Sequence, residues 1–193
     1  QSELAHYAKA AADIEYKFPW GWGEIEGIHD RGDWDLTQHS KHSGKDLSYF
    51  NEETKNRFVP NIIEVSAGVD RTFLAFMCDA YTTEAERIVL KLHPKLAPIK
   101  AAVFPLLKKE EKITKLAREV YKMLKEKFPT HYEDSGNIGK SYRRMDELGT
   151  PACITVDFDS IKGKDVTVRE RDSMKQKRVK IKDLIVYLSK LLA

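Results

Sequence analysis

The sequence predicts a mixed α/β protein of two domains, and its charge pattern and prolines are the observations that divide it. Residues 1–92 hold ten Lys and Arg against sixteen Asp and Glu, a net charge of −6, whereas residues 93–193 have a net charge of +9. Pro94 and Pro98, in KLHPKLAP, interrupt regular structure where the charge changes sign. We therefore expect one domain over residues 1–92 and a second over residues 93–193. The basic domain suits a partner that carries phosphates, and a solvated lysine-rich surface remains the alternative.

The second half alternates strand and helix patterns, which indicates a three-layer α/β domain over residues 97–193. Residues 110–128 carry the clearest amphipathic helix pattern of the chain. A second helix, NIGKSYRRMDELG, is expected to end at Gly149, with Pro151 beyond it. The expected strands are AAVFPL, HYEDS, ACITVDF and a hairpin of VTVRERD with QKRVKI, and the last helix is expected to bury Leu184, Ile185, Leu188, Leu191 and Leu192.

The first half mixes the two patterns less regularly. Residues 2–13 have helical apolar spacing and lead into the strand-like IEYKF, whereas the polar residues 28–57 are expected to form a loop or insertion. FVPNIIEV, residues 58–65, is rich in β-branched side chains and predicts a strand. The small residues SAG then turn the chain, and VDRTFLAFMCDAY predicts a buried helix.

The composition is that of an ordinary globular protein, with 41% hydrophobic and 33% charged residues. No apolar run reaches membrane-spanning length, so no membrane partner is expected. Cys78 and Cys153 stand in apolar neighbourhoods without a CxxC motif, which indicates buried thiols and a reducing, cytoplasmic compartment. Because the chain begins with Gln1 inside a regular pattern, we expect it to be a fragment of a longer protein.

The stretch FPWGWGEIEG is the first candidate site. In an extended chain Trp22, Glu24 and Glu26 would share one face, and the glycines between them leave room for a close approach to the backbone. Two carboxylates on one face are costly to bury without a cation. The stretch therefore indicates a strand that lines a pocket, and an edge strand with both carboxylates in solvent is the alternative.

EVSAGVDR, from Glu64 to Arg71, is the second candidate. It places a carboxylate, a hydroxyl and small residues before a helix whose first turn contains Arg71. Helix N-termini and arginine both favour anions, so the segment suits a polyphosphate. SAG is not a specific phosphate-loop signature, however, and on physical grounds alone a strand-to-helix corner with Arg71 in a structural ion pair is favoured.

Three further patterns are weaker. His39 and His42, spaced HSKH, lack the further ligands that a zinc site needs, so no metal site is expected. SGNIG, residues 135–139, lacks the features of a phosphate loop and predicts a turn before a helix. The basic runs KSYRR and VRERDSMKQKR, with Tyr142 among them, suit binding of single-stranded RNA by phosphate contact and stacking. The alternative is a basic surface without that role.

Taken in order, five segments carry a specific resemblance: FPWGWGEIEGIHDRGDWDLTQHSKHSGKDLSYF, FVPNIIEVSAGVDRTFLAFMCDAY, LAPIKAAVFPL, GNIGKSYRRMDELGTPACITVDFD and VTVRERDSMKQKRV. Together they resemble the C-terminal part of a class II glycyl-tRNA synthetase of the homodimeric type, over essentially the whole chain. The resemblance implies the end of an antiparallel-sheet catalytic domain, an α+β remnant, followed from about Ala97 by a mixed-sheet α/β anticodon-binding domain. It also implies activation of glycine with ATP and Mg²⁺ to glycyl-adenylate, transfer to tRNA(Gly), and a homodimeric parent enzyme.

The resemblance also implies roles for particular residues. Glu24 and Ile25 match the nucleotide site, and Glu26 has no role in the match. The glycine-binding segment falls on Glu64, Val65, Ser66, Ala67 and Gly68. The third class II motif, which binds ATP, falls on Gly68, Val69, Asp70 and Arg71. Arg71 is its phosphate-binding arginine, and Arg71 and Glu24 are the expected catalytic residues. We expect no permanent cofactor and no resident metal.

The first two class II motifs are absent from the sequence, so we expect this chain alone not to form glycyl-adenylate. For the basic domain we expect binding to the anticodon region of tRNA(Gly), with Arg169, Arg171 and Asp172 as the expected contacts. A non-catalytic synthetase-like RNA-binding or accessory module is the main alternative. A generic nucleotide-binding α/β protein is a third hypothesis, but the sequence contains no phosphate-loop motif to support it.

Overall fold

The computed structural model describes residues 4–193 and divides the chain into two compact units, Gln1–Cys78 and Asp79–Ala193, here called the first and second unit. The division falls inside helix α2 (Val69–Ala80). Residues 79–92, predicted as the end of the first domain, therefore count with the second unit by their contacts. The domain boundary at residue 92 stays a prediction.

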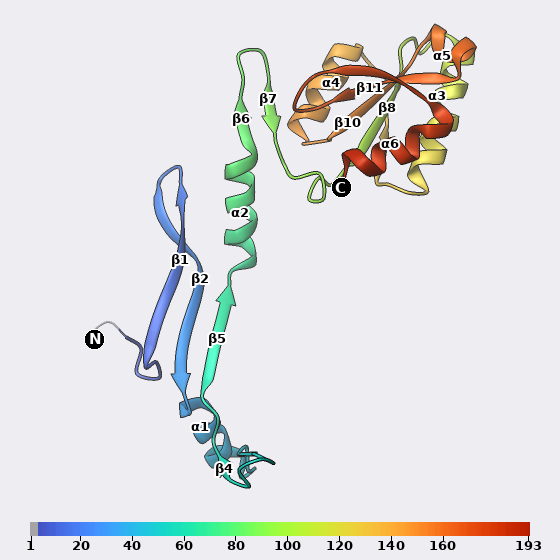
Figure 1. The fold of residues 1–193 in the computed structure, drawn as a ribbon. Helices are drawn as coiled ribbons and strands as arrows, with labels where there is room; N and C mark the ends of the chain where they lie inside the picture. Colours follow the sequence, from blue (N-terminus) through green and yellow to red (C-terminus); the bar gives the residue numbers. More distant parts are fainter. Residues whose placement is uncertain (1–3) are drawn as a thin grey trace. The chain divides into compact units, whose positions relative to one another are not determined.

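The first unit contains a three-stranded antiparallel sheet in the order β1 (Ala10–Phe18), β2 (Gly21–Gly32), β5 (Ile62–Ala67) (Figure 1). The helix predicted over residues 2–13 is wrong, because residues 10–13 belong to β1 and residues 4–9 form no helix; residues 2–3 lie outside the described part. The alanines there favour a helix locally, but pairing of β1 with β2 along its whole length overrides that preference.

The loop predicted over residues 28–57 is also only partly correct. Strand β2 continues to Gly32, helix α1 (Trp34–Ser43) follows, and β3 (Tyr49–Phe50) pairs with β4 (Arg57–Phe58). No residue of α1 is buried, which explains why the sequence shows no apolar stripe there. Gly44, in a left-handed conformation with φ of 69°, ends the helix.

The strand and helix predicted on either side of SAG both exist, with different boundaries. Strand β5 begins at Ile62, after Pro60, and includes Ser66 and Ala67, so Gly68 alone separates it from α2. The helix is not the buried element that was predicted, since Val69 is 82% and Phe73 63% exposed. Ala75 is buried, but the larger apolar side chains of α2 have no covering layer among the described residues of the first unit.

The second unit opens with a hairpin of β6 (Tyr81–Thr83) and β7 (Ile88–Leu90), which was not predicted. Its five-stranded sheet has the order β12 (Gln176–Lys180), β11 (Asp165–Glu170), β10 (Ala152–Val156), β8 (Ala101–Pro105), β9 (Thr130–Tyr132). Strands β9, β8 and β10 run parallel, and β10, β11 and β12 pair antiparallel. The helical elements are α3 (Glu111–Lys125), α4 (Ile138–Glu147), α5 (Phe158–Gly163), η1 (Ile181–Asp183) and α6 (Leu184–Leu191).

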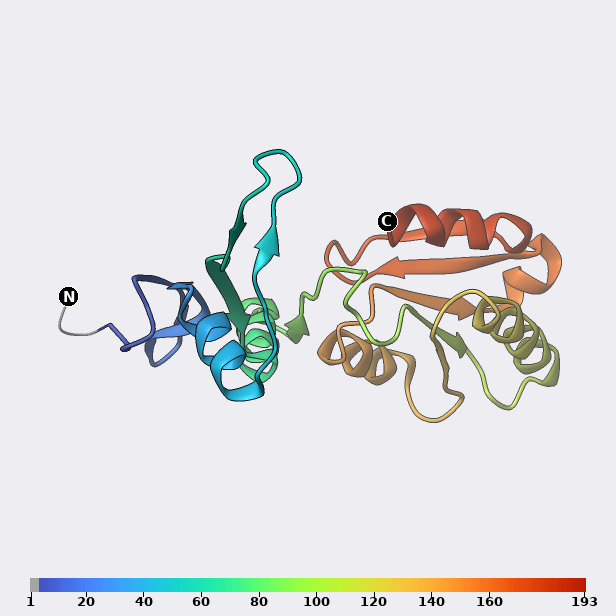
Figure 2. The same ribbon diagram turned by 90° about the horizontal axis from the view of Figure 1, so that it is seen from below.

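Helices lie on both sides of this sheet (Figure 2), which gives the three layers that the sequence predicts. Along β8 the side chains alternate: Ala101 and Val103 pack with α3 and α6, whereas Ala102 and Phe104 pack with α4. The α3 and α6 side holds the larger core, which includes Leu184 and Leu188 as predicted. The predicted mixed α/β class is confirmed, and the short elements α5 and η1 are the helical parts of this unit that the sequence pattern did not indicate.

Candidate substrate and nucleic-acid sites

The opening stretch of β2 is a hairpin turn followed by a bulged strand. Phe18 is buried and stacks on Trp20 with ring centroids 4.9 Å apart, which closes the turn between β1 and β2. The β1–β2 register pairs Glu24 with Glu15 and Glu26 with Ile14, so Ile25 has no partner on β1.

This bulge corrects the prediction that Glu24 and Glu26 share a face. Neighbouring residues Ile14 and Glu15 point to opposite faces of β1, and residues paired across two strands share a face. Glu24 and Glu26 therefore lie on opposite faces. Glu24 is exposed and has no cation partner among the described residues. Its Oε1 lies over Gly27, 3.6 Å from the position that a β-carbon would occupy there.

Pairing of β2 with β5 brings the predicted nucleotide and ATP segments together. The N–H of Gly68 donates to the carbonyl of Ile25 at 3.2 Å, and Nη1 of Arg71 donates to the carbonyl of Glu24 at 2.8 Å. Within residues 4–193 no carboxylate lies within ion-pair distance of Arg71, so the ion pair considered as an alternative is not what holds it. Its charge is therefore not compensated.

In the predicted glycine-binding segment, only Glu64 is held by a side-chain contact that the structure shows among the described residues. Glu64 uses Oε2 to accept from Arg31, which also donates to Asp35 and stands 4.1 Å from the centre of the Tyr7 ring. The hydrogen bond from Arg31 holds the pKa of Asp35 below its ordinary value. The remaining predicted residues of this stretch are exposed: Val65, Ser66, Ala67, Gly68, Val69 and Asp70.

In the second unit, the arginines predicted to contact tRNA are buried and already hydrogen-bonded. Arg169 donates from Nη1 and Nη2 to Asp146 at 2.8 and 2.9 Å, and its guanidinium lies 4.9 Å from the centre of the Tyr142 ring. Arg171, with 2% exposure, donates to the carbonyl of Gly149 and to Asp172. Only Asp172 of the three is exposed.

A third arginine, which sequence reasoning missed, completes this cluster. Arg87, from the β6–β7 hairpin, donates from Nη1 to Asp146 and to the carbonyl of Arg171, both at 2.8 Å, and from Nε to Glu84. Hydrogen bonds from Arg87 and Lys91 lower the pKa of Glu84 to about 2. Nothing in ERIVL distinguishes a buried arginine from an exposed one, because the partner carboxylate lies 59 residues further along the chain.

Beside this cluster lies a pocket of about 310 Å³. Arg87 lines this pocket, but its Nη2 is itself buried and has no hydrogen-bond partner in the described part of the chain. The pocket is lined by Glu84, Ala85, Glu86, Arg87, Gly139, Tyr142, Arg143, Asp146, Arg169 and Met174.

None of the helices formed by residues 4–193 is both long and apolar enough to cross a membrane. In the same residues, no group of three or more His, Cys, Asp or Glu side chains is placed to hold a metal ion, and His39 and His42 gain no third ligand.

Comparison with known families identifies the class of the second unit. Residues 100–191 match the family model described as an anticodon binding domain, which is a class defined by recognition of tRNA. A solved structure of prolyl-tRNA synthetase from Cryptosporidium parvum is similar in fold over the whole chain, with a TM-score of 0.74 and 21% identity, and the chain covers 40% of it.

Curated relatives narrow the family further. The chain is 55% identical over 97% of its length to a glycine–tRNA ligase of Borreliella burgdorferi, and 53% identical over 96% to that of Clostridium acetobutylicum. It spans 43% and 41% of the length of these two relatives. The chain thus belongs with the C-terminal part of the class II glycyl-tRNA synthetases, and the resemblance inferred from the sequence is confirmed.

Proposed function

We propose that the chain is part of a cytoplasmic, homodimeric glycine–tRNA ligase, which joins glycine to tRNA(Gly) through glycyl-adenylate formed from ATP with Mg²⁺. The relatives' names and their identity of more than 50% to this chain support the proposal. The chain alone, which spans less than half of those relatives, would contribute one wall of the catalytic site.

The observation that carries the proposal is the uncompensated charge of Arg71. Arg71 stands in the first turn of α2, and its guanidinium is hydrogen-bonded to the neutral carbonyl of Glu24. The guanidinium keeps further N–H donors for an anion. A phosphate placed there would accept from Arg71 and from the backbone N–H groups of the first helical turn. Arg71 would then stabilise the charge that develops on the leaving pyrophosphate.

For glycine we propose the face of β5 that carries Glu64 and Ser66. Glu64 uses Oε2 for Arg31, which leaves Oε1 to accept from the ammonium group of glycine. The hydroxyl of Ser66 is exposed two residues along the same face and would contact the carboxyl end. Because glycine has no side chain to bind, selectivity must come from excluding larger ones.

For tRNA we propose that the pocket beside Arg87 receives a nucleotide base of the anticodon. Tyr142 and Arg143, which line the pocket, would supply stacking surfaces for the base. Arg169 also lines this pocket, whereas Arg171 is buried and would act by holding the β11–β12 turn. Asp172 is exposed outside the pocket.

The first test uses the full-length parent protein and measures glycine-dependent exchange of pyrophosphate into ATP. Arg71→Ala is expected to lower kcat/KM by about 10²–10³-fold, the scale of losing one transition-state donor, and Glu24→Gln is expected to lower it as well. Glu26→Gln, on the opposite face of β2, is the matched control and should retain activity. Unchanged exchange by Arg71→Ala would refute its role, and exchange by the 193 residues alone would refute their dependence on the rest of the enzyme.

The second test measures binding of the tRNA(Gly) anticodon stem-loop to the chain. The affinity for the stem-loop is expected to fall steeply as the salt concentration rises. It is also expected to fall when Arg143 is replaced by Ala. Equal affinity for an unrelated stem-loop would contradict anticodon reading. If the full-length protein bound the stem-loop but performed no exchange, an accessory RNA-binding module would be the better description.

A further inference from the structure

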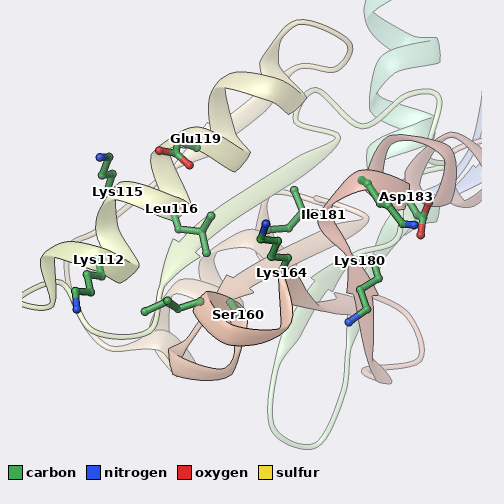
Figure 3. A pocket seen from close by; sticks show the side chains of 11 residues that line it. Lys112, Lys115, Leu116, Glu119, Ser160, Lys164, Lys180, Ile181 and Asp183 are labelled. Atoms are coloured by element: carbon green, nitrogen blue, oxygen red, sulfur yellow. The ribbon is translucent and has the colours of Figure 1, made fainter.

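A second hollow of the second unit lies away from the Arg87 cluster and has no part in the function proposed above. It has a volume of about 920 Å³ and opens between α3, α5, the end of β12 and η1 (Figure 3). Its floor includes Leu116 and Ile181, which pack on the α3 and α6 side of the sheet, whereas Tyr142 of the Arg87 pocket belongs to α4 and packs on the other side. The two hollows are therefore on different sides of the sheet.

The floor of this hollow is apolar. Leu116 and Ile181 are half-buried and face the middle of the hollow (Figure 3), and Ile161 is 37% exposed. An inserted apolar side chain would remove these surfaces from water. No aromatic ring and no arginine lines this hollow among the described residues, so it lacks the groups on which nucleic-acid bases stack.

The rim is positively charged. Lys112, Lys115, Lys164 and Lys182 have no carboxylate within 4.0 Å in the part of the chain described here. A fifth lysine, Lys180, is different, because its Nζ donates to the carbonyl of Gly163 and to Asp165. Two carboxylates, those of Glu119 and Asp183, also stand at the rim, so positive charge remains in excess.

Lys164 adds a conformational observation. It follows α5 with φ of 46° and ψ of 44°, a left-handed conformation that glycine adopts most easily and that a β-carbon disfavours. A long cationic side chain thus stands at the rim of the hollow where glycine would fit the backbone better.

We propose that this hollow docks an acidic segment of another protein that carries an aliphatic side chain. The aliphatic side chain would enter between Leu116, Ile161 and Ile181, and flanking Asp or Glu residues would pair with the free lysines. Charge complementarity selects an acidic partner, and the apolar floor without stacking groups favours a peptide over RNA.

The test uses the chain with isotope-labelled Leu and Ile methyl groups and three probes. The first probe is a short acetylated peptide of Asp and Glu with two central Leu residues, the second has Ser in place of Leu, and the third is a uridine oligonucleotide. We expect the first peptide to shift the methyl signals of Leu116, Ile161 and Ile181, and the second to do so much less. No shift with the first peptide at millimolar concentration would overturn the proposal, as would equal shifts with the oligonucleotide.

Variants then separate the hollow from general charge. Lys164→Gly and Lys182→Glu should each lower the affinity for the first peptide about two- to fivefold, which is the scale of one exposed ion pair. The matched controls are Met174→Gly, at another left-handed residue, and Lys190→Glu, outside the hollow. Equal weakening by the controls would show non-specific attraction and overturn the proposal. Binding of the tRNA stem-loop should not change in Lys182→Glu, so the two proposals fail independently.

Discussion

Replacing Asp146 by Asn is expected to destabilise the second unit strongly. The carboxylate of Asp146 is 1% exposed and accepts hydrogen bonds from Arg87 and from both terminal nitrogens of Arg169, whose side chains are 6% and 7% exposed. Asn keeps the shape of Asp but removes the charge between two guanidinium groups. It also turns an N–H donor toward one of them, since an amide has only one acceptor oxygen.

The magnitude follows from the burial of all three groups. Removing one partner of a buried ion pair costs about 3–5 kcal/mol, because a charge is left without compensation in a medium that solvates it poorly. For a domain of this size the dependence of unfolding free energy on urea is roughly 1.5 kcal/mol per M. The urea midpoint of the second unit should therefore fall by about 2–3 M.

The assay can follow the two units separately. The three tryptophans of the chain, Trp20, Trp22 and Trp34, all lie in the first unit, so tryptophan fluorescence reports that unit alone. Far-ultraviolet circular dichroism reports both units. The circular-dichroism transition of the second unit should move in Asp146→Asn, and the fluorescence transition should not.

Two further variants sharpen the test. Asp172→Asn, which removes an exposed carboxylate from Arg171, is the control and should cost less than about 1 kcal/mol. The triple variant Arg87→Met, Asp146→Leu, Arg169→Met removes the cluster together and should regain most of the stability. A loss below about 1 kcal/mol in Asp146→Asn, or a triple variant as unstable as the single one, would refute the reasoning.

Three other results are expected. Hydrogen bonds from Arg87 and Lys91 depress the pKa of Glu84 to about 2. The contribution of Glu84 to stability is therefore complete above its ordinary pKa of 4.5 and is lost as the pH falls toward 2. Glu84→Gln should flatten this part of the dependence of stability on pH, measured by urea unfolding. Burial raises the pKa of the Cys153 thiol to about 12, so a thiol reagent at neutral pH should label Cys78 alone until urea is added, and rapid labelling of both would contradict this. Gly149→Ala should lower the unfolding free energy by about 2 kcal/mol, because Gly149 has φ of 76° and a β-carbon would stand 2.8 Å from a backbone carbonyl oxygen of β7; an unchanged urea midpoint would exclude that strain.

The second unit could be predicted from the sequence because its local patterns and its packing agree. Residues 152–156 form a fully buried strand, and the apolar stripe of residues 111–125 forms a helix against the same sheet. In the first unit the same reasoning failed at residues 10–13, where pairing with β2 decides the conformation of helix-forming alanines. Local preference identifies an element only where the tertiary contacts favour the same one.

The candidate sites show the same division. Gly68 and Arg71 could be singled out from the sequence because a small residue and an arginine at a helix start suit an anion, whereas their expected roles, and that of Glu24, came from the resemblance. The separation of Glu24 from Glu26 could not be predicted, since a one-residue bulge has no signature in GEIEG. The buried positions of Arg169 and Arg171 depend on a carboxylate and a carbonyl more than 20 residues away, which charge patterns do not reveal.

The sheet of β1, β2 and β5 has almost no interior. Phe18 and Ala75 are the only apolar side chains buried among residues 4–78, whereas Ile63 and Val65 of β5 are 61% and 62% exposed. Burial of apolar surface is the main favourable contribution to folding, so this arrangement is separated from less ordered ones by a small free energy.

For ligand binding this makes folding and recognition one equilibrium. Under the function proposed above, only the molecules in which Arg71 rests on the carbonyl of Glu24 would be ready for a nucleotide, and the apparent affinity would fall by the fraction of molecules in that state. Each contact that the remainder of the synthetase makes with this sheet would raise that fraction. ATP and the missing walls of the catalytic domain would thus stabilise the same conformation, each strengthening the effect of the other.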